Sequence, residues 1–189
     1  MQQIAIIEAL DNRETDKNIC EENDIAYIFD SYYKRVFNYI YYRVNKQEIT
    51  EDLTSEVFEK IILKISTFSD KKSPFEVWVF AIARNVVNDY FRNLKKYRLF
   101  SLEVVKDFVS KEKTPEEFII REETNEGLFQ ALKILSTKER NIVALKFGAN
   151  LKNKEIAVML DITESNVGVI LYRTMKKLRK EIERRGENE

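Results

Sequence analysis

The pattern of apolar and polar positions along the chain predicts an all-helical protein. Apolar residues recur three and four positions apart in three successive segments between residues 24 and 98, with polar or charged residues at the remaining positions. Capping signals fit these segments. Asp24 precedes the first, Thr50 the second, and Ser73-Pro74-Phe75-Glu76 opens the third as a capping box. We therefore expect helices at about 24–44, 50–66 and 73–98.

The helical period returns in the C-terminal part of the chain. Ser136-Thr137-Lys138-Glu139 is another capping box. Residues 153–173 then read as two short helices around a turn at Asp161 and Ile162, with Thr163 or Ser165 as the cap of the second. This pattern is typical of a helix-turn-helix, whose second helix can lie in the major groove of DNA. An ordinary helical hairpin has the same pattern, so both interpretations remain open here.

Residues 99–113 break the helical period, and a connection of about fifteen residues is long inside one compact domain. Thr114-Pro115-Glu116-Glu117 then repeats the capping signal, and we expect it to open a helix. The sequence therefore predicts two small helical domains, at residues 23–98 and 123–185. A flexible linker at 99–122 joins them, and an N-terminal arm at 1–22 precedes the first.

The composition excludes several classes of function. The 189 residues contain no histidine and one cysteine, which removes Ser-His and Cys-His catalysis, His-ligated metals and an intrachain disulfide. The chain shows no phosphate-binding glycine loop, secretory signal or membrane span. We expect no metal, no cofactor and no enzymatic activity in a soluble, cytoplasmic protein. An enzyme built on carboxylates alone is the remaining enzymatic alternative.

Charge is neutral in sum but uneven along the chain. The formal net charge is +0, yet basic residues gather at 84–98 and again at 173–185. Two basic segments in a neutral chain suggest two surfaces that face phosphates, although either could be a solvated helix face.

Several segments resemble a known family. Residues 73–96, SPFEVWVFAIARNVVNDYFRNLKK, resemble the second conserved region of bacterial sigma factors of the extracytoplasmic-function type. The preceding ITEDLTSEVFEKI resembles the helix before that region, and residues 128–182 resemble the fourth region over its whole length. The matching positions of the second region are Phe75, Trp78, Ile82, Ala83, Asn85, Asp89, Tyr90 and Arg92. Two matches in the right order are more specific than a helix-turn-helix alone.

This resemblance implies an alternative sigma factor. Such a protein binds the RNA polymerase core and directs it to promoters. Its second region recognises and melts the minus-ten element, and its fourth region docks on the polymerase flap and reads the minus-thirty-five element as duplex. The partners implied are core polymerase, promoter DNA in duplex and melted form, and an anti-sigma factor, and the free protein should be a monomer. The alternative is a helix-turn-helix transcriptional regulator that does not join polymerase.

The resemblance also assigns candidate residues, because melted bases stack on aromatic rings while basic groups follow the backbone. The minus-ten candidates are Lys72, Ser73, Asn85, Asp89, Arg92, Lys95 and Lys96. The minus-thirty-five candidates are Thr163, Glu164, Ser165, Asn166, Gly168, Val169, Tyr172, Arg173, Lys176 and Lys177. The polymerase-docking candidates are Glu51, Asp52, Glu56, Phe58 and Glu59, with a core position as the alternative for Phe58.

The chain departs from the family pattern at two places in the helix-turn-helix. Asp161 stands where a glycine is common, and aspartate tolerates the left-handed backbone that such a turn requires. Gly168 and Val169 stand where basic or polar residues are common. We expect contact with a thymine methyl group, or readout of DNA shape, to replace hydrogen bonds there.

Overall fold

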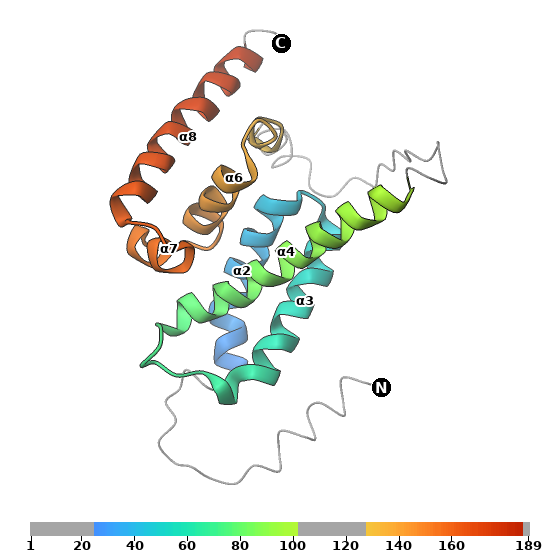
Figure 1. Ribbon diagram of the computed structural model, residues 1–189, viewed down its shortest axis with the longest axis vertical. Helices are drawn as coiled ribbons and strands as arrows, with labels where there is room; N and C mark the ends of the chain where they lie inside the picture. Colours follow the sequence, from blue (N-terminus) through green and yellow to red (C-terminus); the bar gives the residue numbers. More distant parts are fainter. Residues whose placement is uncertain (1–24, 102–127, 187–189) are drawn as a thin grey trace.

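The computed structural model describes residues 25–101 and 128–186, and no strand occurs in either range (Figure 1). The all-helical prediction is therefore confirmed. The N-terminal half contains α2 (Ile25–Val44), α3 (Gln47–Lys64), the 3-10 turn η2 (Ile65–Thr67) and α4 (Phe75–Ser101). The C-terminal half contains a helical turn at 128–132, α6 (Thr137–Val143), the π-helical turn η3 (Ala144–Gly148), α7 (Asn153–Leu160) and α8 (Glu164–Gly186).

The predicted helix starts agree with the structure at some caps and differ at others. Ser136 and Glu139 form the predicted capping box, in which the Glu139 backbone N–H donates to Ser136 Oγ at 3.3 Å. Thr50 does not cap α3. Its buried hydroxyl donates instead to the Lys46 carbonyl at 2.7 Å, and the helix begins earlier, at Gln47. The N-terminal arm and the predicted linker lie outside the described residues, except that α4 continues to Ser101.

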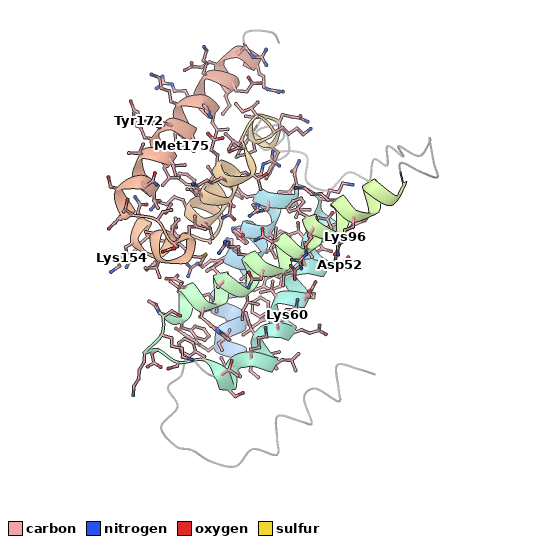
Figure 2. The ribbon with its side chains drawn as sticks, viewed as in Figure 1. Asp52, Lys60, Lys96, Lys154, Tyr172 and Met175 are labelled. Atoms are coloured by element: carbon pink, nitrogen blue, oxygen red, sulfur yellow. The ribbon has the colours of Figure 1, made fainter. Side chains whose placement is uncertain are left out.

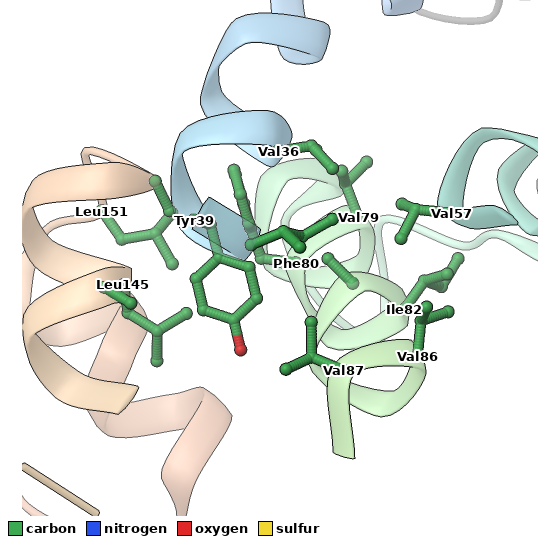
Figure 3. Packing of buried hydrophobic residues seen from close by; sticks show 14 of the residues in the cluster. Val36, Tyr39, Val57, Val79, Phe80, Ile82, Val86, Val87, Leu145 and Leu151 are labelled. Carbon is green, nitrogen blue, oxygen red and sulfur yellow. The ribbon is translucent and has the colours of Figure 1, made fainter. Parts of the chain in front are cut away.

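The two halves pack on one another and share a hydrophobic core. Buried residues of α2, α3 and α4 form one continuous cluster with those of η3, α7 and α8. Tyr39 of α2 lies at the centre of this cluster, between Phe80 of α4 and the leucines Leu145 and Leu151 of the C-terminal half (Figure 3). A second, smaller cluster within the C-terminal half joins Leu132, Val143 and Leu178.

Candidate nucleic-acid and polymerase interfaces

The turn between α7 and α8 has the geometry of a helix-turn-helix. Asp161 ends α7 with φ 54° and ψ 51°, the left-handed conformation that the sequence required of this position. The Ile162 N–H donates to the Ala157 carbonyl at 3.1 Å, which closes the turn. The Asn166 N–H donates to Thr163 Oγ1 at 3.2 Å, so Thr163 rather than Ser165 supplies the cap of α8.

α8 divides into a buried side and an exposed side. Val167, Leu171 and Leu178 pack into the core. Tyr172 is 73% exposed on the outer side, whereas Met175 faces the rest of the C-terminal half (Figure 2). The exposed side holds every minus-thirty-five candidate except Gly168, which is half-buried: Thr163, Glu164, Ser165, Asn166, Val169, Tyr172, Arg173, Lys176 and Lys177. The structure thus places these candidates on one accessible helix face.

Lys177 differs from its basic neighbours because it is already paired. Its ammonium contacts the Glu139 carboxylate of α6 in an ion pair. The hydrogen bond from Lys177, followed by those from Ser136, lowers the pKa of Glu139 to about 2. Arg173 and Lys176 have no carboxylate within ion-pair distance among the residues that the structure describes. These two side chains are therefore the more available cations for DNA on this face.

Most minus-ten candidates follow one side of α4. Asn85 and Arg92 are seven positions apart and Arg92 and Lys96 four, so all three share a face, and all three are exposed. Lys95 is exposed beside them, and the Arg92 guanidinium donates to the half-buried Asp89 carboxylate at 2.8 Å. The result is a polar and basic strip along the C-terminal part of α4.

Lys72 and Ser73 lie apart from that strip, in the loop before α4. A helix rises about 1.5 Å per residue, so Asn85 is roughly 15 Å along the axis from the first residue of α4. The structure therefore does not bring the loop residues next to Asn85. Beside the loop, the rings of Phe68, Phe75 and Trp78 form a cluster with centroids 5.0 to 5.4 Å apart. Trp78 is half-buried there, at the margin of the core.

The acidic candidates form an accessible face on α3. Glu51, Asp52 and Glu59 are exposed, while Glu56 is half-buried and pairs with Lys60. Asp52 and Lys60 both lie on α3 (Figure 2). Phe58 lies on the same side of α3 as Glu51 but is not accessible. It is only 7% exposed and is covered by two aromatic rings of α2, which supports the alternative that placed it in the core.

Those rings belong to a surface that the sequence analysis did not identify. Phe29, Tyr33, Phe37 and Tyr41 stand four positions apart on α2, and successive ring centroids lie 4.7, 6.3 and 6.2 Å apart. We call these four residues the aromatic ladder. Helical periodicity alone is consistent with a core position for Phe29, yet its side chain is 45% exposed. The sequence signal for this surface was the repeat of four aromatic residues at a spacing of four, which lies beside the core-facing stripe of α2.

A second missed feature is an apolar groove in the C-terminal half. It has a volume of about 640 Å³ and lies between the turn at 128–132, η3 and α8, with Tyr42 of α2 at one side. Leu128, Phe147 and Ile182 line it, and Phe147 and Ile182 are about half exposed. Its apolar lining suits one face of an amphipathic helix.

Comparison with known proteins agrees with this geometry. The family model described as Sigma-70 region 2 matches residues 28–97, and that of Sigma-70 region 4 matches residues 126–178. The ECF RNA polymerase sigma factor BldN of Streptomyces coelicolor is 32% identical over 162 residues, covering 84% of this chain and 60% of its own length. SigX of Bacillus subtilis, another ECF sigma factor, is 27% identical over 166 residues, covering 86% of this chain and 85% of its own.

Solved structures share the fold. The sigma factor RpoE in complex with the anti-sigma factor NepR from Bartonella quintana matches with a TM-score of 0.67 at 17% identity, over 85% of this chain and 97% of that one. CnrH in complex with the cytosolic domain of CnrY matches with a TM-score of 0.58 at 16% identity, over 94% of each chain. None of the described helices has the length and apolar character to cross a bilayer. The chain belongs to the sigma-70 family and is an alternative sigma factor of the ECF type, which directs transcription initiation.

Proposed function

We propose that this sigma factor reads a promoter in two parts, with α8 on the minus-thirty-five duplex and α4 on the melted minus-ten strand. One observation carries the proposal. A single chain exposes a helix-turn-helix face and, on another helix, a separate polar and basic strip, while the acids of α3 form a third surface. The functional units are residues 123–185 and 23–98 respectively.

On α8, the N-terminal turn and the following exposed positions enter the major groove. Asn166 and Arg173 have the side chains that form paired hydrogen bonds to adenine and guanine edges. Lys176 contacts phosphate, and the half-exposed Lys177 does so once it leaves Glu139. Val169 is 42% exposed on the same face and suits a thymine methyl group.

On α4, Arg92, Lys95 and Lys96 hold the backbone of the displaced strand, and Asn85 hydrogen-bonds to a base. Asp89 orients Arg92 through their 2.8 Å hydrogen bond. Trp78, half-buried beside the loop that carries Lys72 and Ser73, offers an aromatic ring for stacking. The roughly 15 Å between this loop and Asn85 corresponds to contacts with different nucleotides of the element.

Polymerase docks on α3 and α2 together. The fitting partner is a helix with a basic side and an apolar side. Its basic side meets the exposed Glu51 and Asp52, and its apolar side covers the aromatic ladder. Glu51 and Phe58 are seven positions apart on one side of α3, and Phe58 lies beneath Phe29 and Tyr33, so acids and ladder adjoin. The groove beside Phe147 and Ile182 takes an apolar helix of the polymerase flap.

An anti-sigma protein is a further partner of this chain. The solved structures that share its fold are complexes of this kind: RpoE with NepR, and CnrH with a cytosolic domain of CnrY. An inhibitor that covers the docking surfaces would compete with polymerase. Because polymerase works in the cytoplasm, the cytoplasm is the proposed location of the protein.

The test is reconstitution of the full chain with bacterial core polymerase and a library of promoter fragments. We expect a stable complex and initiation from a subset of fragments. Asp52→Lys should reduce core affinity at least tenfold, and Asp52→Asn, which removes the charge but keeps the shape, should reduce it less. Lys133→Glu, an exposed charge reversal in the C-terminal half, should leave core affinity unchanged. Specific DNA binding by the chain without any core complex would instead support a regulator that does not join polymerase.

A further inference from the structure

Helix α8 contains a glycine that the packing of the protein does not require. Gly168 is the fifth residue of α8, inside the helix, where glycine is the poorest helix former after proline. None of the described glycines has a positive φ, so the backbone conformation does not require glycine here. Apart from its chain neighbours and the helix backbone, a Cβ atom added at Gly168 would meet nothing within 4 Å. Glycine thus weakens the helix at this position without improving any contact within the chain.

Gly148 is the contrasting case. A Cβ atom added there would lie 2.9 Å from both the N and the Cα atoms of Tyr39, so the packing of η3 on α2 requires glycine. That requirement comes from within the molecule, and Gly168 has none of this kind. The reason for a glycine at 168 then points to something that approaches the backbone of α8 from outside.

The open space at Gly168 lies at the edge of the exposed side of α8. Residues three and four positions apart are neighbours on a helix surface, so Ser165 stands one turn before this space and Tyr172 one turn after it. Val169 adjoins it in the chain. Ser165 and Tyr172 are exposed, Val169 is 42% exposed, and Gly168 itself is half-buried. We call this space, with the Gly168 backbone as its floor and the other three side chains around it, the notch.

The chemistry of the notch favours a small apolar occupant. Its largest walls are the Val169 isopropyl group and the Tyr172 ring, and both are accessible. No basic residue lies three or four positions from Gly168, whereas the exposed Glu164 carboxylate lies four positions away. A phosphate in the notch would therefore be repelled by Glu164 without a neighbouring cation to attract it. The apolar group that base pairs present in the major groove is the C5-methyl group of thymine.

The size of the notch suits one methyl group from outside. Non-bonded carbon atoms pack about 3.5 to 4.0 Å apart. A methyl group at this distance from the Gly168 Cα atom would overlap any Cβ atom that projected towards it. An alanine methyl group at 168 and a thymine methyl group would therefore compete for the same space.

We infer that Gly168 is a specificity-determining residue of α8, because its missing side chain lets the C5-methyl group of one thymine in the minus-thirty-five element enter the notch. The inference rests on the proposed function, which places α8 in the major groove. It adds the position at which a base is read and the chemical group that is read. At this position α8 distinguishes thymine from uracil and from cytosine, which lack the methyl group.

The test changes each side of the contact separately and then together. Holoenzyme made with the full chain is titrated with a minus-thirty-five duplex selected from a promoter library. Each thymine is replaced in turn by deoxyuridine, which lacks only the methyl group. With the wild type, one replacement should weaken binding about fourfold, the value for one buried methyl group. Gly168→Ala should weaken binding to the parent duplex about tenfold through overpacking. The same variant should bind that deoxyuridine duplex more tightly than the parent duplex, which reverses the order expected of the wild type.

Two measurements control for effects on the fold and on the helix. Thermal unfolding of the free chain should show a midpoint about 2 to 4 °C higher for Gly168→Ala, because alanine favours the helix. Weaker DNA binding by this variant would then not come from unfolding. Ser165→Ala places an alanine one turn earlier without filling the notch, so deoxyuridine should still weaken its binding about fourfold.

The inference is wrong if the selected element holds no thymine, or if no deoxyuridine weakens wild-type binding. It is also wrong if Gly168→Ala binds both duplexes with equal loss or with none. In each case, weaker duplex binding by Arg173→Ala would leave the proposed function standing. If Arg173→Ala also leaves duplex affinity unchanged, α8 does not read the major groove, and the proposed function fails together with the notch.

Discussion

Glu139 in the first turn of α6 and Lys177 on α8 form an ion pair across the helix-turn-helix domain. This pair separates two adjacent lysines that the sequence treats alike, since Lys176 has no such partner among the described residues. The Glu139 carboxylate thus connects α6 to α8 and pairs with one of the cations on the exposed side of α8.

We predict different salt dependences for the two lysines. Lys176→Ala should reduce the slope of log K against log salt for minus-thirty-five duplex by about 0.9, the value for one lost phosphate contact. Lys177→Ala should reduce it less, because that ammonium must first leave Glu139. Titrations of holoenzyme with duplex at several salt concentrations measure both slopes. Glu139→Gln frees Lys177 and should steepen the slope; equal slopes for both lysine variants would contradict the prediction.

The same pair predicts a pH effect on stability. The pKa of Glu139 is lowered to about 2, so the pair stabilises the fold above the ordinary carboxyl range and loses this contribution as pH falls towards 2. Glu139→Gln should reduce the free energy of unfolding at pH 7 by about 1 kcal/mol, a small value because Lys177 is half-exposed. Urea denaturation of both proteins from pH 7 to pH 2 measures the difference, which should shrink with acid. A constant difference would show that the carboxylate charge is not responsible.

Substitutions of aromatic residues on α2 and α3 should affect stability and polymerase binding to different extents. Phe58→Ala removes a buried ring and should cost about 3 to 4 kcal/mol of unfolding free energy. Phe29→Ala removes an exposed ring and should cost less than about 1 kcal/mol, yet it should weaken core binding about tenfold, because the ladder loses one end. Urea denaturation and core titration measure the two effects. If Phe29→Ala binds core like the wild type, the ladder does not form part of the docking surface.

The sequence was sufficient for the features that local chemistry determines. The capping box at Ser136, the left-handed turn at Asp161 and the exposed face of α8 all follow from neighbouring residues, and the structure has each of them. Family resemblance located both regions in their correct order. These features depend on contacts within about four positions of the chain, which periodicity and capping rules can detect.

The features that sequence reasoning missed depend on contacts distant in sequence. Tyr39 lies in the centre of the shared core because η3 packs on α2, and no local pattern identifies that contact. Gly148 has no positive φ; its lack of a side chain matters because of Tyr39, more than a hundred positions away. Thr50 had the chemistry of a cap but was buried by tertiary packing. The burial of these positions depends on the helices that pack against them, so helix periodicity alone could not predict it.

The turn at Asp161 provides the last prediction. A residue with φ 54° is strained unless its side chain tolerates left-handed backbone, which glycine does fully, aspartate partly and β-branched residues hardly at all. Asp161→Gly should therefore keep the unfolding free energy within about 0.5 kcal/mol of the wild type, whereas Asp161→Val should lose about 1 to 2 kcal/mol. Thermal and urea denaturation measure both. Asp161 is exposed, so Asp161→Asn, which also tolerates this conformation, controls for the lost charge. If Asp161→Val has the same unfolding free energy as Asp161→Gly, backbone strain does not limit which residues this turn tolerates.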